Sequence, residues 1–214
     1  MNRLSLPRRP WCGVVIALAL LLSGTAPVAQ ATKLQKQNIT QLIAASESII
    51  GGVVTDVHDG IDDKGVPYTQ VTIGVGASAK GTIEPQQHFT FRQFGLLAPR
   101  PQADGSTLLA LTPEGFPSWR KGEYVVAFLH RAGTRTGLRT TAGLAQGKLS
   151  MINDRLVNAF DNAGLFDEVR IAPSLLSAEE QALLHSKGPV DMRTFMGLIG
   201  RAVRNGWVEK GVMQ

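Results

Sequence analysis

Apolar and polar residues alternate in three stretches of the first half of the chain, a pattern typical of β-strands with one buried face. The stretches are residues 48–57, 68–75 and 88–93, and short polar or glycine-containing connections separate them. Such spacing predicts an antiparallel meander. Gly51 and Gly52 interrupt the first stretch and predict a bulge or bend there.

A nearly continuous apolar run covers residues 122–130. Continuous rather than alternating apolar character predicts a central strand that is covered on both faces. Weaker strand patterns follow at 138–144, 147–152 and 155–160, and residues 153–154 predict a tight turn between the last two.

Residues 95–121 separate the meander from the apolar run and carry four prolines, which predicts a long excursion with a small strand at 106–111. Within it, Ser118 and Lys121 match the Ser-x-x-Lys pattern of serine acyl enzymes. That chemistry needs both residues on the first turn of a buried helix, whereas Pro117 favours a loop here. A loop without catalysis is the favoured interpretation.

Helical periodicity appears at both ends of the mature sequence. Residues 37–46 predict a short amphipathic helix, and 177–180 form a capping box before another. Asp191 is positioned to cap a third helix with one apolar stripe. The stripe predicts either docking onto the strands, which is favoured, or a partner surface; it comprises Met192, Phe195, Met196, Ile199 and Val203.

The first 31 residues have the pattern of an export signal. Arginines precede an apolar stretch at 14–22, and residues 29–31 supply a small-x-small cleavage pattern. An uncleaved anchor is the alternative. We expect a periplasmic or extracellular protein with no membrane span after cleavage, because no later run reaches the roughly 18 apolar residues of a membrane helix.

Removal of residues 1–31 changes the charge and the cysteine content. The net charge of +5 falls to +2, since the segment contains three arginines and no acidic residue. A balance this close to neutral does not favour nucleic-acid binding. Cys12 is the only cysteine, so cysteine catalysis, disulfides and cysteine-based zinc sites are excluded for the mature chain.

Carboxylates gather between residues 56 and 63, where hard oxygen ligands suit calcium. The candidate ligands are Asp56, Asp59, Asp62 and Asp63. Their spacing departs from that of an EF-hand loop, and a solvated hairpin turn is the alternative. No other cofactor is expected.

Three segments together carry a family resemblance: residues 46–57, residues 68–81 with their Tyr-Thr start and Lys-Gly end, and the Gly-Glu-Tyr strand at 122–129. Their order resembles the OB-like barrel of the netrin module and of the tissue inhibitors of metalloproteinases. The chain is more closely similar to uncharacterised secreted bacterial proteins with this barrel and C-terminal helices. The resemblance implies a mainly β fold: an antiparallel barrel of five or slightly more strands, with a short N-terminal helix and C-terminal helices.

The inhibitory mechanism of the tissue inhibitors of metalloproteinases is not expected in this chain. Those inhibitors chelate the zinc of their target through an N-terminal cysteine, and the mature chain here has none. OB barrels also bind ligands through exposed aromatic and cationic side chains on one face. The residues matching that description are Tyr68, Arg92, Trp119 and Arg120. Covering the barrel ends is the alternative role for the aromatic residues.

The sequence thus predicts a signal peptide at 1–31, a barrel domain at 32–165 and a helical appendage at 166–214. Three functions remain open. The favoured one is an exported, non-catalytic binding module for a protein or envelope component. The others are a hydrolase using Ser118 and Lys121, and a calcium-dependent matrix or adhesion component.

Overall fold

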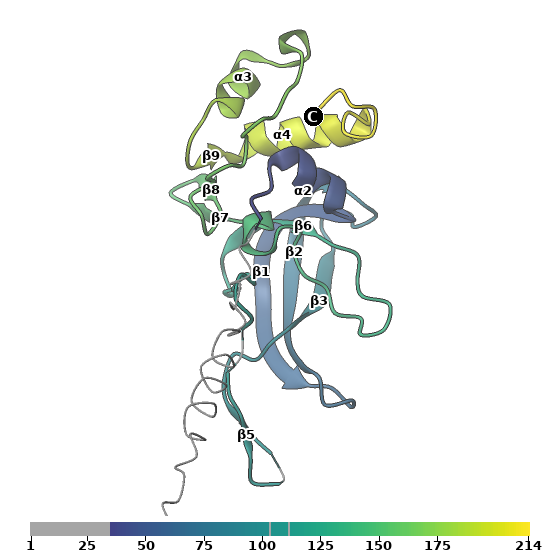
Figure 1. Cartoon of the computed structure of the whole chain (residues 1–214), viewed down its shortest axis with the longest axis vertical. Helices are drawn as coiled ribbons and strands as arrows, with labels where there is room; N and C mark the ends of the chain where they lie inside the picture. The colour runs from purple at the N-terminus through teal and green to yellow at the C-terminus, as the bar shows by residue number, and fades with distance from the viewer. Residues whose placement is uncertain (1–34, 103, 111) are drawn as a thin grey trace, which may run out of the picture. The chain divides into compact units, whose positions relative to one another are not determined.

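The computed structural model describes residues 35–102, 104–110 and 112–214, which fold around one antiparallel sheet with the strand order β3-β2-β1-β6-β7-β8-β9 (Figure 1). The predicted signal peptide lies outside the described residues. The strands of the sheet are β1 (Ser48–Ile61), β2 (Pro67–Lys80), β3 (His88–Phe94), β6 (Tyr124–Leu129), β7 (Lys148–Ile152), β8 (Arg155–Val157) and β9 (Val190–Asp191).

The predicted meander is confirmed, with longer strands than expected. β1 pairs with β2 and β2 with β3, all antiparallel. Residues 59–61 were expected in the turn but belong to β1, because their backbone stays paired with the start of β2. The register between β1 and β2 shifts at Gly51–Gly52, so the predicted bulge is also confirmed.

The central position of β6 is confirmed, and the strand separates two hydrophobic cores. Val125, Ala127 and Leu129 point into a core with the meander residues. Val126 and Phe128 point to the opposite face, into a core built with the helices. All five side chains are fully buried. The continuous apolar run therefore reflects burial on both faces of the sheet.

Helices α2 (Ile39–Ala45) and α4 (Met192–Arg204) cover the second of these faces, and α3 (Ala178–Leu184) packs on α4 (Figure 1). Ser177 forms the predicted capping box of α3 with Glu180, and Asp191 caps α4. Phe195 and Ile199 of α4 are fully buried in the core that also holds the α2 side chains. Docking is thus the confirmed role of the α4 stripe.

The C-terminal residues also add to the sheet. β9 pairs with β8, so the segment 166–214 contributes both a strand and core side chains to the same compact unit, Gln35–Gln214. The predicted tight turn at 153–154 joins β7 and β8, with positive φ angles of 50° and 60°. Such angles at both central residues are those of a type I′ hairpin turn.

The mainly β fold with short helices is confirmed, but the closed five-stranded barrel is not what the strand pairing shows. Seven strands form an open sheet with β3 and β9 at its edges. The predicted strand at 138–144 is also wrong, since within the described residues only a single bridge, between Thr141 and Leu129, forms there, followed by a 3-10 turn, η1 (Leu144–Gly147). Gly143 and Leu144 take positive φ angles, which end the extended backbone.

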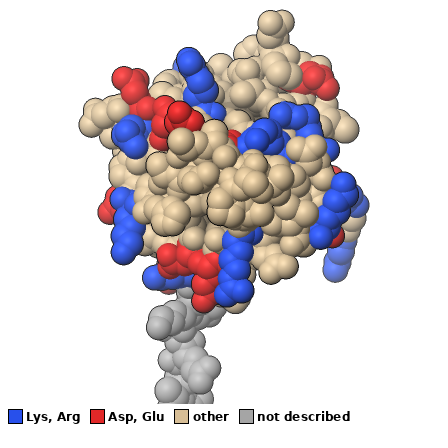
Figure 2. Space-filling model, turned by 90° about the horizontal axis from the view of Figure 1, so that it is seen from above, with Lys and Arg blue, Asp and Glu red and all other residues tan. Residues whose placement is uncertain are grey.

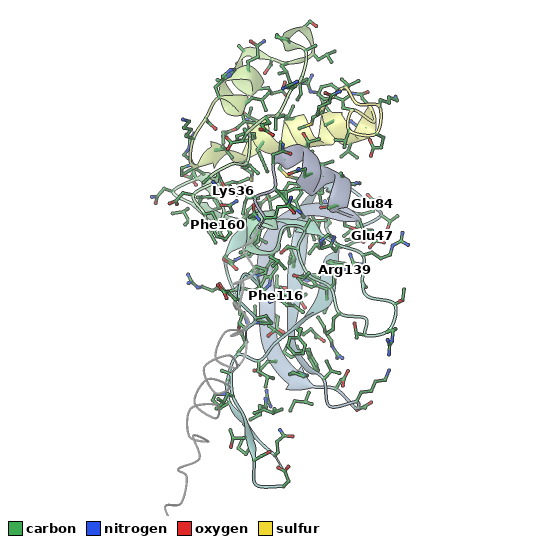
Figure 3. The ribbon with its side chains drawn as sticks, in the orientation of Figure 1. Lys36, Glu47, Glu84, Phe116, Arg139 and Phe160 are labelled. Atoms are coloured by element: carbon green, nitrogen blue, oxygen red, sulfur yellow. The ribbon has the colours of Figure 1, made fainter. Side chains whose placement is uncertain are left out.

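Residues 138–141 nevertheless run between β6 and β3. The His130 N–H donates to the Thr140 carbonyl at 3.0 Å, and the Arg139 N–H donates to the Arg92 carbonyl of β3 at 2.7 Å. The Arg139 side chain binds Glu47, next to the start of β1, at 2.9 Å (Figure 3). This segment therefore links the edge strand of the meander to the centre of the sheet.

The excursion at 95–121 contains the small β-ladder of β4 (Arg100–Pro101) and β5 (Thr107–Leu108). The expected strand at 106–111 is thus present in shortened form. A second 3-10 turn, η2 (Pro173–Leu175), precedes α3. None of the helices in the described part of the chain is long and apolar enough to cross a membrane.

Candidate functional site

A row of three polar side chains crosses the inner face of the meander, the face that carries Val71 and Phe91. Asp59 of β1 pairs in register with Thr69 of β2, which pairs with Gln93 of β3. Thr69 and Gln93 are buried, and the Asp59 side chain is only 9% exposed. Each of the three binds the excursion at 95–121, so the row anchors that segment to the sheet.

Asp59 holds the first part of the excursion. Its carboxylate accepts hydrogen bonds from the N–H groups of Leu97, at 2.6 Å, and Ala98, at 3.1 Å, and pairs with Arg100. Burial acts to raise the pKa of Asp59, but the hydrogen bonds from Arg100 and the two N–H groups outweigh it. The pKa therefore lies below that of an ordinary aspartate.

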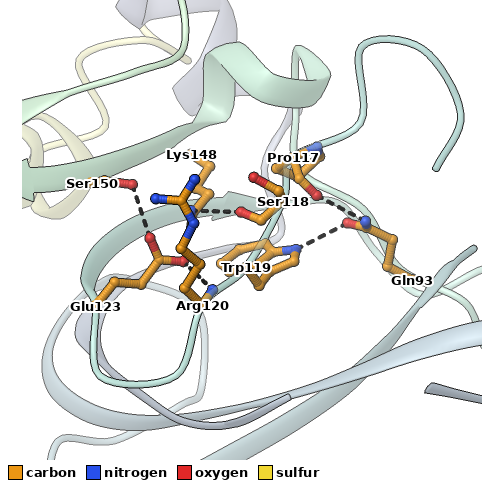
Figure 4. Close-up of polar contacts among 8 residues, drawn as sticks. All are labelled: Gln93, Pro117, Ser118, Trp119, Arg120, Glu123, Lys148 and Ser150. Atoms are coloured by element: carbon orange, nitrogen blue, oxygen red, sulfur yellow. Dashed lines mark hydrogen bonds and ion pairs between the residues drawn. The ribbon is translucent and has the colours of Figure 1, made fainter. Parts of the chain in front are cut away.

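Gln93 holds the last part of the excursion. Its amide donates to the Pro117 carbonyl at 3.0 Å and accepts from the Trp119 indole at 3.1 Å (Figure 4). A third contact forms where the Ala145 N–H donates to the Gly115 carbonyl at 2.8 Å. Trp119 is buried and packs edge-to-face on Phe91. Residues 115–120 are thus fixed at several points and form a rigid wall.

Next to this wall, Lys148 of β7 and Glu123 form an ion pair with an Nζ–Oε1 distance of 2.7 Å (Figure 4). Their side chains are only 9% and 17% exposed. The Lys148 ammonium also donates to the Ser118 carbonyl at 2.7 Å and lies 5.1 Å from the centre of the Trp119 ring. The pair therefore joins β7 to the wall.

Burial lowers the pKa of Lys148. The hydrogen bond and charge of Glu123 oppose this shift, and the charge of Arg120 adds to it. Glu123 is fully engaged, since its carboxylate also accepts from the Arg120 N–H at 2.7 Å and the Ser150 hydroxyl at 3.3 Å. The site thus holds two cationic side chains and one carboxylate.

The wall, β7 and the residues after β8 enclose a pocket of about 360 Å³. The polar lining comprises Ser118, Arg120, Glu123, Lys148, Ser150 and Asn158. The apolar lining comprises Phe116, Pro117, Ala145, Met151, Ile152, Val157 and Ala159. A concave surface with a few convergent polar groups on an apolar lining is the usual form of a ligand pocket.

Two of the four predicted ligand residues lie together, but on a different face. The Arg92 guanidinium stacks 4.0 Å from the centre of the Tyr68 ring and donates to Gln70 at 2.8 Å. Because side chains alternate along a strand, these residues point away from the inner row. Trp119 is buried and Arg120 lines the pocket, so the four do not share one binding face.

Three of the four candidate calcium ligands serve separate local roles. Asp59 anchors the excursion, Asp56 binds His58 at 2.7 Å, and Asp62 accepts from two N–H groups of its turn. Asp63 is exposed. Among the residues that the structure describes, no three His, Cys, Asp or Glu side chains are grouped so as to hold a metal ion.

The Ser118 and Lys121 pair is not assembled. Both residues are exposed, and no hydrogen bond between their side chains occurs in the described chain. The lysine that contacts Ser118 is Lys148, and it binds the carbonyl oxygen rather than the hydroxyl. A base for activating the hydroxyl is therefore not positioned by these contacts.

Thr69, Gln93 and Lys148 are not among the candidate residues named from the sequence, and Asp59 is named there only as a calcium ligand. For Thr69 and Gln93 the alternation nevertheless contained a signal. Thr69 lies on the same face of its strand as Val71 and Ile73, and Gln93 lies on the same face as Phe89 and Phe91. A polar residue at the next inward position indicates a buried group that needs a partner. What it binds depends on tertiary structure.

Comparisons of the chain with models of known families, with curated proteins and with solved structures gave no match. On the surface seen in Figure 2, basic and acidic side chains are interspersed around uncharged areas. The pocket and its charges are therefore the features that point to a function.

Proposed function

We propose that this protein is an exported, non-catalytic binding module that recognises a protein or envelope component through the pocket beside Lys148. The observation that carries the proposal is the fixed wall of the pocket. Residues 115–120 are held by Gln93, Lys148 and the Ala145 N–H before any ligand arrives. A preorganised site loses little conformational entropy on binding, which favours affinity.

Arg120 provides the means to test this proposal. It is exposed, it lines the pocket, and its guanidinium makes no hydrogen bond or ion pair within the described residues. The substitution Arg120→Glu reverses the charge at the pocket without removing a structural contact of the side chain. Arg135→Glu is the matched control, because Arg135 is also exposed and does not line the pocket.

The experiment is capture from envelope extract and culture medium of the producing cell, with the wild type and both variants compared by quantitative mass spectrometry. We expect one component to bind the wild type and Arg135→Glu stoichiometrically and to be lost with Arg120→Glu. Equal capture by all three proteins would contradict recognition through this pocket, as would no component above background.

We also propose that the sheet is a variant of the OB-like barrel in which residues 138–141 replace a regular closing strand. The support is the pair of backbone links from this segment, one to β6 and one to Arg92 of β3. Amide hydrogen exchange tests it. The Arg139 N–H should exchange as slowly as the amides of β2, and exchange at the rate of an open loop would refute the closure.

A further inference from the structure

The charges in the pocket beside Lys148 do not balance. Lys148 and Arg120 contribute two positive charges and Glu123 one negative charge. The Glu123 carboxylate is already bound by the Lys148 ammonium, the Arg120 N–H and the Ser150 hydroxyl. The Arg120 guanidinium therefore remains the free cationic group of the site in the described part of the chain.

We propose that this pocket binds a ligand through a single carboxylate, received by the Arg120 guanidinium, with an apolar group of the ligand on the Ile152 side. The inference rests on the proposed binding function and specifies the chemistry of its ligand. Figure 4 shows the Arg120 guanidinium next to the Lys148 side chain, and both residues line the pocket. A guanidinium forms paired hydrogen bonds with a carboxylate, and these are stronger than neutral ones.

A monoanion fits the site better than a phosphate. One carboxylate neutralises the net single positive charge of the pocket. A phosphate monoester carries about −1.5 to −2 charges near neutral pH, which would leave excess negative charge beside Glu123. Because the Glu123–Lys148 pair is mostly buried, solvent screens that repulsion weakly.

The apolar part of the lining accommodates an apolar group next to the carboxylate. Ile152 is 57% exposed although it is a strand residue, and Val157 and Phe116 lie only partly buried along the same pocket. A volume of about 360 Å³ lies at the small end of ligand pockets. It suits one amino-acid side chain or a short acyl chain, so the C-terminus of a peptide and a free organic acid both satisfy the chemistry.

Calorimetric titration distinguishes these sources. The protein, purified as the cell exports it, is titrated with N-acetyl-Ala-Ala-Leu as the free acid, the same peptide as the C-terminal amide, hexanoate and phenyl phosphate. We expect the acid peptide to bind at least about tenfold more tightly than its amide, as for loss of a charge-assisted hydrogen bond. Binding of hexanoate without the acid peptide would support the same site with a free acid as its ligand.

Two matched pairs of variants locate the binding. Arg120→Gln should weaken binding of the acid by about tenfold or more, while Arg135→Gln leaves it unchanged. Ile152→Ser should weaken binding and Leu109→Ser should not, because Leu109 is 72% exposed but does not line the pocket. All four positions are exposed, so these changes leave the fold intact.

Three results would overturn the inference: no binding by either acid in the millimolar range, equal binding of acid and amide, or tighter binding of phenyl phosphate. The capture experiment distinguishes failure of this inference from failure of the proposed binding function. If Arg120→Glu still abolishes capture while the acids do not bind, the pocket recognises its partner by other chemistry.

Discussion

The Trp119 indole donates a hydrogen bond to the Gln93 amide oxygen at 3.1 Å, which ties the pocket wall to the edge strand β3. The same Gln93 side chain donates to the Pro117 carbonyl. One buried amide thus satisfies two groups of the wall, and the rigidity of the pocket depends on a residue that does not line it.

Gln93→Leu should destabilise the protein by about 2–4 kcal/mol, because it leaves the Trp119 N–H and the Pro117 carbonyl buried without partners. Urea unfolding followed by tryptophan fluorescence measures the change. The matched control is Gln70→Leu on the outward face, which loses one exposed hydrogen bond to Arg92 and should cost under about 1 kcal/mol. Equal effects of the two changes would show that the wall does not depend on Gln93.

Asp59→Asn should lower the free energy of unfolding at neutral pH by about 1–3 kcal/mol, since it removes the charge that binds Arg100 and the two N–H groups. The folded-state pKa of Asp59 lies below its ordinary value. Its stabilisation is therefore complete above the ordinary aspartate pKa and is lost as the pH falls through the lower, folded-state value.

The difference between the wild type and Asp59→Asn should accordingly shrink in acid. Unfolding free energies measured from neutral pH to below the aspartate range give this profile directly. Asp63→Asn is the control, because Asp63 is exposed and its substitution should have no effect at any pH. A constant difference between the wild type and Asp59→Asn would contradict the anchoring role of the charge.

Lys148→Met should cost about 3–5 kcal/mol, because it leaves the Glu123 carboxylate mostly buried and unpaired. The double variant Lys148→Met, Glu123→Leu should be more stable than the single one, since no uncompensated charge remains. Chemical unfolding of the wild type, Lys148→Met, Glu123→Leu and the double variant gives a double-mutant cycle, which measures the coupling of the two side chains. Additive effects would mean that the two side chains are not coupled.

Gly52→Ala should destabilise the protein by about 3 kcal/mol, because a Cβ at this position would lie 2.2 Å from the Gly74 carbonyl oxygen of the neighbouring strand. A backbone atom of β2 cannot move aside without disturbing the ladder. At Gly76 the nearest atom would lie 3.8 Å away, an ordinary contact. Thermal unfolding should thus separate Gly52→Ala from a nearly neutral Gly76→Ala, and similar midpoints would refute the close approach of the strands.

The local elements followed from the sequence because their causes are local. The continuous apolar run of β6 predicted burial on both faces, and the capping residues Ser177 and Asp191 marked the starts of α3 and α4. The strand predicted at residues 138–144 is wrong because Gly143 and Leu144 adopt positive φ angles, although the apolar pattern of the segment resembles that of a strand. The spacing of apolar residues gives no information about the sign of a backbone φ angle.

The candidate site was predicted only in fragments. Of the four candidate ligand residues, Arg120 alone lines this pocket: Trp119 is buried, and Tyr68 and Arg92 lie on the outward face of the meander. Lys148 was not among the predicted residues. The spacing along the chain explains why the contacts of Lys148 and Gln93 could not be predicted. Glu123 and Lys148 are 25 positions apart and Gln93 and Trp119 are 26 apart, so no short motif contains either pair.

The sequence by itself determined the order of the longer strands and the helices, the faces that each would bury and the helix starts, because side-chain periodicity and capping act over a few residues. Tertiary structure decided that the seven strands of the described sheet pair in an open order, that Asp59, Thr69 and Gln93 hold the 95–121 excursion, and that Lys148 meets Glu123 next to Arg120. Buried polar groups require partners, but which distant residue supplies the partner is set by how the elements pack, and the pocket exists only after that packing has formed.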